Sequence, residues 1–196
     1  MVGLLRTGIS VFLVALLGIP SGRAQDKTFI VNPGQSGVMF SLGDVLHQVH
    51  GTFQVQSGKV QFEDSGSQLS GSIVVGAGSG KSGNDTRDHR MSVDILNAPQ
   101  FTEVTFSPKR LHGAIAATGD STVQVDGVFM LHGTPHDLTV PMQVHIDGTA
   151  CTAKTHFMIP YVKWGLKDPS TFLLRVNKEV GMEITLVGQL STTTSQ

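Results

Sequence analysis

Cysteine and charge are both scarce in this chain of 196 residues. Cys151 is the only cysteine, so an intramolecular disulfide is excluded. Charged residues make up 15% of the sequence, without a basic stripe for a nucleic-acid backbone or a polybasic segment for an anionic membrane surface. The composition therefore predicts no nucleic-acid partner.

A hydrophobic run long enough to cross a membrane is also missing. The stretch "GISVFLVALLGI" holds about a dozen largely apolar residues, whereas a spanning helix needs roughly 20. Arg6 precedes it, and Gly22 and Ala24 place small residues at the −3 and −1 positions of a cleavage site. We expect residues 1–24 to be a signal peptide and residues 25–196 a secreted or periplasmic domain without a transmembrane segment. An uncleaved N-terminal anchor is the alternative.

The sequence is rich in alternation of apolar and polar residues with a period of two. In "LTVPMQVHID", Leu138, Val140, Met142, Val144 and Ile146 share one face. Similar stretches recur from "TFIV" to "VGMEITL", separated by turn-forming segments such as "EDSGSQ", "HGTPHD" and "IDGT". About eight to ten such strands with short connections predict an all-β antiparallel sheet, and closure into a barrel would remove its exposed edges.

The alternation is lost in "TRDHRMSVDILNAPQF". Asn84 or Asp85 is suited to cap a short helix, and Met91 and Ile95 then fall on one side at helical spacing. We expect a short helical insertion near 84–97, between two strands.

Four stretches occur in an order that is typical of one family. They are "SGVMFSLGDVLHQVHGTFQVQSGKVQFE", with a V-x-G-x-F strand; "NDTRDHRMSVDILNAPQFTEVTFSPKRL", with an Asn-x-x-Arg-Asp segment; the hairpin "VDGVFMLHGTPHDLTVPMQV"; and the closing strand "VGMEITLVGQL". Together they resemble the YceI-like, polyisoprenoid-binding family. Members usually carry Arg-Asp-x-His-Leu where this chain has "RDHRM", so the histidine stands one place early.

The resemblance implies a lipocalin-like antiparallel β-barrel of about eight strands that spans residues 25–196 and holds a long apolar chain. It implies a bound isoprenoid-type lipid as the partner, no other cofactor, and a homodimer as a candidate assembly. The residues themselves support such a container, because a barrel of about eight strands leaves room for side chains or one slender ligand. A barrel filled by its own side chains is the alternative.

The predicted inward faces supply the candidate lining residues. They are mostly of middle size, with three phenylalanines as bulky exceptions, and the methionines suit irregular ligands. The candidates are Phe53, Val55, Phe106, Phe129, Leu138, Val140, Met142, Val144, Phe157, Met182 and Ile184. Cys151 falls on the inward face of its own strand and is expected to be a buried structural thiol.

The segment "NDTRDHRM" concentrates titratable side chains. A metal site would need three or four ligands, and Asp85 and His89 would supply two. A catalytic site would need a nucleophile beside a base, and the sequence contains no G-x-S-x-G motif. We therefore expect Arg87 and Asp88 to tie the helix to strand ends by charge-assisted hydrogen bonds. A helix across a barrel mouth would act as a lid, and Arg87, Asp88, His89 and Trp164 are the candidates for meeting a ligand's head group.

Two histidines flank a predicted turn in "HGTPHDL". His132 and His136 stand four apart, but Gly133 and Pro135 are typical of a hairpin, and turn histidines without a third ligand are expected to be solvated.

These patterns predict a non-enzymatic carrier or sequestering protein for a long-chain apolar molecule, such as an isoprenoid, a quinone or a fatty-acid derivative. The competing classes are a stress-related or structural protein with a filled barrel and an enzyme that modifies such a lipid.

Overall fold

The computed structural model describes residues 26–43, 47–63, 66–171 and 175–193. The predicted signal peptide, residues 1–24, lies outside the described residues. All strand pairs are antiparallel. The strands are β1 (Asp26–Val31), β2 (Gly37–Gly43), β3 (Gln48–Phe53), β4 (Val55–Glu63), β5 (Leu69–Gly76), β6 (Glu103–His112), β7 (Gly119–Leu131), β8 (Thr134–Asp147), β9 (Ala150–Ile159) and β10 (Val180–Thr193).

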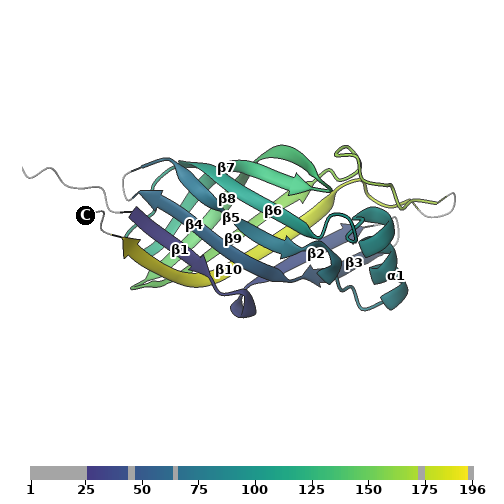
Figure 1. The fold of residues 1–196 in the computed structure, drawn as a ribbon, viewed down its shortest axis with the longest axis horizontal. Coiled ribbons are helices and arrows are strands. Elements are labelled where there is room, and N and C mark those ends of the chain that lie inside the picture. Colours follow the sequence, from purple (N-terminus) through teal and green to yellow (C-terminus); the bar gives the residue numbers. More distant parts are fainter. Residues whose placement is uncertain (1–25, 44–46, 64–65, 172–174, 194–196) are drawn as a thin grey trace, which may run out of the picture.

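The sheet closes on itself. Its order is β1-β4-β5-β6-β7-β8-β9-β10-β2-β3, and β1 also pairs with β10. Strands β1 and β2 lie end to end along β10. On their other side, β4 pairs with β1 and β3 pairs with β2, so β3 and β4 also lie end to end. The ten strands therefore occupy eight positions around the barrel. The expected closed antiparallel barrel of about eight strands is confirmed (Figure 1).

The break between β1 and β2 has a local cause. Pro33 begins a 3₁₀ turn, Pro33–Gln35, and the Asn32 side chain accepts a hydrogen bond from the Gly34 amide. Proline and glycine favour turns over extended strand. The turn therefore separates β1 from β2, while both strands remain paired with β10.

The barrel has two distinct ends (Figure 1). At the α1 end lie the β7–β8 turn, the β9–β10 connection and helix α1 (Asp85–Arg90). At the terminal end lie the start of β1 and the end of β10.

The helical insertion lies between β5 and β6. The Asn84 side chain caps α1 by accepting a hydrogen bond from the Arg87 amide at 2.9 Å. A π-helical turn, Met91–Ile95, follows α1 directly. Met91 and Ile95 pack against the core. The predicted insertion near 84–97 is confirmed.

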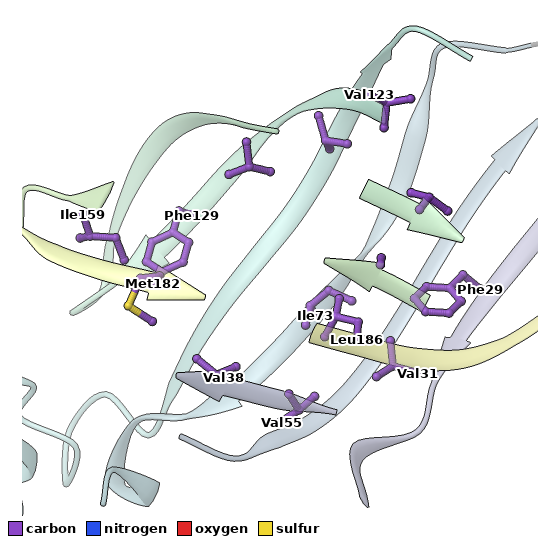
Figure 2. Close-up of a cluster of buried hydrophobic side chains, with 14 of the residues drawn as sticks. Phe29, Val31, Val38, Val55, Ile73, Val123, Phe129, Ile159, Met182 and Leu186 are labelled. Carbon is purple, nitrogen blue, oxygen red and sulfur yellow. The ribbon is translucent and has the colours of Figure 1, made fainter. Parts of the chain in front are cut away.

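The inward faces follow the period-two pattern, and their side chains form the core. Along β7 the buried positions are the odd-numbered ones from Val123 to Leu131, and along β8 the even-numbered positions point inward. Figure 2 shows buried side chains that project into the interior from several strands, among them Phe29, Val55 and Phe129. The hydrophobic alternation of the sequence therefore sets which residues face the interior.

Candidate functional site

The barrel wall is incompletely paired between β8 and β9. The strand β8 pairs with β7 from Thr134 to Ile146, and β9 pairs with β10 along its whole length. Between β8 and β9, however, the described ladder stops at Gln143 and Lys154. We call the stretch beyond that point, residues 134–142 of β8 and 155–159 of β9, the seam. It opens toward the α1 end.

Pro141 gives a physical reason for the seam. The β8–β9 turn is a two-residue hairpin at Gly148 and Thr149, closing on the pair Asp147 and Ala150. Because such a hairpin closes on a hydrogen-bonded pair, the odd-numbered residues of β8 direct their backbone groups toward β9. Pro141 is the first odd position past the end of the ladder, and it has no N–H to donate.

The loop that follows β9 covers the seam from the α1 end. Trp164 in this loop stacks on His136 of β8, with ring centroids 4.1 Å apart and planes within 4°. Its indole also lies 5.8 Å from the Phe129 ring, which in turn lies 6.3 Å from Phe157. Aromatic rings from three strands and the loop therefore gather beside the seam.

The same loop is held by a buried tyrosine. Tyr161 donates its hydroxyl to the Asn177 carbonyl at 2.7 Å, and the Leu166 amide donates to the Tyr161 carbonyl at 3.0 Å. Burial raises the pKa of Tyr161 to about 12, with a smaller contribution from Asp168. The hydroxyl thus remains a neutral donor over the physiological range.

Two buried polar atoms at the seam lack partners. Among the described residues, only Nε2 of His136 and Oγ1 of Thr155 are buried side-chain atoms without a hydrogen-bond partner. His136 occupies an inward position of β8, and Thr155 an inward position of β9. The expectation that the turn histidines are solvated is therefore wrong for His136, because its even number places it on the same inward face as Leu138.

His132 also differs from the expectation. It lies in the β7–β8 turn with φ at 52°, next to Gly133 at 72°, and its ring lies 4.5 Å from that of Phe101. Two consecutive positive φ angles are typical of a type I′ hairpin. The "HG" pair therefore serves the turn, as the sequence indicated, while the imidazole packs on an aromatic ring.

The eleven predicted lining residues divide into two groups. All belong to the core or pack against it. Five are buried: Val55, Phe129, Val140, Val144 and Met182. Six retain some accessible surface, although their strands turn them inward: Phe53, Phe106, Leu138, Met142, Phe157 and Ile184.

Arg87 and Asp88 meet at one residue, Ser82. Asp88 is buried and accepts hydrogen bonds from the Ser82 amide at 2.8 Å and from the Ser82 hydroxyl. Arg87 donates from Nε to the Ser82 hydroxyl oxygen at 2.7 Å and from a terminal nitrogen to the Ser82 carbonyl at 2.8 Å. The neighbouring Lys81 pairs with Thr52 of β3 through two backbone bonds. The two side chains therefore tie α1 to the loop beside β3.

The other lid candidate on this helix, His89, is exposed, and its side chain makes no hydrogen bond or ion pair with the described residues. Within the described ranges, no three His, Cys, Asp or Glu side chains gather where they could hold a metal ion. The helices in that part of the chain are too short or too polar to cross a membrane.

Cys151 is buried on the inward face of β9. Burial raises the pKa of its thiol to about 11. The thiolate is the nucleophilic form of cysteine, so this environment disfavours nucleophilic chemistry at Cys151.

Comparison with known families assigns the fold. The YceI-like domain model matches residues 29–188. The chain belongs to the YceI-like domain family. No curated protein matches the sequence.

Solved structures of low sequence identity share the fold. BcnA of Burkholderia cenocepacia is 20% identical, with a TM-score of 0.68 over 81% of this chain and 99% of that one. A polyisoprenoid binding domain from Saccharophagus degradans, implicated in plant cell wall breakdown, is 16% identical, with a TM-score of 0.67 over 83% of this chain and 98% of that one. The Campylobacter jejuni YceI protein is 16% identical, with a TM-score of 0.60 over 74% and 86%.

The seam is the feature that sequence reasoning missed. The sequence carried only partial signals of it: His136 and Thr155 have the same parity as the apolar residues of their strands, and Pro141 interrupts a strand, but neither observation shows which neighbouring strand Pro141 faces.

Proposed function

We propose that this protein binds one long-chain apolar lipid inside its barrel and carries or sequesters it without altering it chemically. The observation that carries the proposal is the accessible apolar surface on inward positions of the α1 half. Leu138, Met142 and Phe157 point inward along the seam yet are only partly buried.

The location of this surface supports a ligand. Apolar surface that faces the interior and stays accessible is stabilised by contact with an apolar chain, at about 25 cal/mol for each Å² removed from water. Nearer the terminal end, the inward side chains Val123, Ile146 and Leu186 are buried, whereas Phe62 and Leu190 are partly buried. A chain inserted from the α1 half would meet the accessible apolar side chains beside the seam first.

Family membership supports the same proposal. A relative of this fold is a polyisoprenoid binding domain. We extend polyisoprenoid binding to this chain, add quinones and fatty-acid derivatives as long-chain ligands of similar shape, and propose a secreted or periplasmic location. A non-enzymatic role is supported by the buried, protonated thiol of Cys151.

Native mass spectrometry of the protein purified from its own source tests the proposal. We expect a mass excess of one lipid per chain that organic extraction removes, and recovery of the same lipid unchanged after incubation with the protein. The same spectrum reports whether the chain forms a homodimer. A protein that never carries a releasable lipid would indicate a filled barrel, and conversion of the added lipid would indicate an enzyme.

A further inference from the structure

The two unpartnered polar atoms of the described interior both belong to the strands that flank the seam. Nε2 of His136 lies on β8 and Oγ1 of Thr155 on β9. Buried polar side-chain atoms are paired in the large majority of cases, so each exception needs a cause. A ligand group that bonds to one of these atoms would supply that cause.

His136 is the better placed of the two. Its position lies near the start of β8, at the open end of the seam, whereas Thr155 adjoins the last paired residue, Lys154, at the closed end. The Trp164 ring lies flat against the imidazole and fixes its plane. An imidazole Nε2 donates or accepts a hydrogen bond according to its tautomer, so either kind of polar ligand group suits it.

The surroundings of His136 decide the charge of that ligand group. Its inward neighbours along β8 are Leu138, Val140 and Met142, and the inward residues of β9 beside the seam are Thr155, Phe157 and Ile159. None of these carries a formal charge. The cationic Lys154 of β9 is exposed on the opposite face. An anionic phosphate buried among these side chains of β8 and β9 would find no cationic partner on the inward face of either strand, which makes its transfer from water costly.

We propose that His136 is the head-group contact of the bound lipid, and that it hydrogen-bonds through Nε2 to a neutral polar end such as a hydroxyl, phenol, carbonyl or amide. The inference rests on the proposed function. The apolar chain then lies along Leu138, Met142 and Phe157, and Trp164 covers the polar end from the α1 side.

The single tryptophan of the chain provides the readout. Because Trp164 stacks on His136, its fluorescence reports occupancy at this point of the barrel. Delipidated protein is titrated with hexadecanol, hexadecane and hexadecyl phosphate, which share one chain and differ in their ends. We expect the wild type to bind hexadecanol about tenfold more tightly than hexadecane, as one added buried hydrogen bond allows. The phosphate should bind more weakly than the alcohol.

Three variants assign the preference to His136. His136→Phe keeps an aromatic ring against Trp164 but removes the nitrogen. This variant should bind hexadecanol and hexadecane about equally well, with its affinity for hexadecane unchanged. His136→Gln restores a hydrogen-bonding side chain and should recover part of the preference. His156→Phe, at an exposed position of β9, should keep the wild-type preference. Each preference is a ratio of two affinities within one variant, so a general loss of folded protein does not imitate the effect.

The outcomes separate the two proposals. Equal binding of hexadecanol and hexadecane by the wild type, or an unchanged preference in His136→Phe, overturns the head-group contact while the lipid carrier stands. Tightest binding of hexadecyl phosphate overturns the neutral class. If none of the three ligands binds, the carrier function fails and the head-group contact fails with it.

Discussion

Asp88 and Ser82 are joined by two hydrogen bonds, from the Ser82 amide and the Ser82 hydroxyl to the same carboxylate oxygen. The hydroxyl bond, with the amide bond and the nearby charges of Lys81 and Arg87, holds the pKa of the Asp88 carboxyl below its ordinary value of 3.8. A carboxyl whose pKa is lower in the folded state stabilises that state above its unfolded pKa, and this contribution disappears as the pH falls through the folded value.

The Asp88 contribution can be isolated by a difference measurement. We expect Asp88→Asn to lower the free energy of unfolding at neutral pH, and the gap to the wild type to narrow as the pH falls below 3.8. A difference is needed because the pKa values of Asp126 and Asp168 are also held low, by hydrogen bonds from His112 and Ser170. Urea unfolding at several pH values is the measurement, with the exposed Asp85→Asn as the control. A gap that stays constant down to pH 2 would contradict the assignment.

Met142 and Gln143 test the interior directly, because neighbouring residues of a strand point to opposite faces. Met142 points inward at the seam and Gln143 is exposed. Met142→Lys puts an unpaired cation where the apolar chain is expected, so lipid loading should fall by at least about tenfold, since burying a lone charge costs several kcal/mol. Gln143→Lys should leave loading intact.

Loading is measured by native mass spectrometry, and urea unfolding verifies that both variants are folded. Full loading of a folded Met142→Lys protein would show that the lipid does not lie along this part of β8. If the variant unfolds and the wild type carries no lipid, Met142 is ordinary core.

Alternation predicted the antiparallel strands and the face that each turns inward, while closure into a barrel followed from the need to remove sheet edges and from the family resemblance. Along β8, the residues from Leu138 to Ile146 that share one face in the sequence are the ones that face the interior. The insertion was equally readable, since Asn84 caps a helix at the point where alternation is lost. Both features depend on local chemistry, namely side-chain period and capping, which a single sequence displays.

The seam could not be predicted because it depends on pairing between strands. A proline in a strand indicates an edge or an interruption, but only the register shows that Pro141 faces β9 rather than β7. Likewise, the stacking of Trp164 on His136 joins residues that are 28 positions apart in the sequence (164 − 136). Their types gave no sign that they would meet.

Pro141→Thr tests the origin of the seam. The side chain is exposed, so the change adds one backbone donor toward β9 with little effect on the interior. We expect the ladder to extend to His156, because 141 and 156 continue the register of Gln143 and Lys154. The His156 amide should exchange hydrogen more slowly. Release of hexadecanol, followed by Trp164 fluorescence, should slow by roughly threefold, which is near the lower end of what one net hydrogen bond contributes.

Gln143→Thr is the matched control, since position 143 is already in the ladder and a threonine there adds no donor. If exchange at His156 and release of hexadecanol are both unchanged in Pro141→Thr, then the curvature of the wall, and not the proline, ends the ladder.

Thr155→Val tests whether the second unpartnered atom is a cost to the empty protein. Valine has nearly the shape of threonine but no hydroxyl, so it removes a buried oxygen that bonds to nothing while keeping the packing against the interior. Leaving such a group unpaired costs about 1–3 kcal/mol, and we expect the free energy of unfolding of the delipidated protein to rise by about 1 kcal/mol. Thr152→Val, on the outward face of β9, should change this free energy by less than about 0.5 kcal/mol.

Because the head group is proposed to bond to His136, the Thr155→Val protein should still bind hexadecanol more tightly than hexadecane. A clear loss of stability in urea would mean that an ordered water bonds to this hydroxyl, and a lost preference would move the head-group contact from the open end of the seam to its closed end.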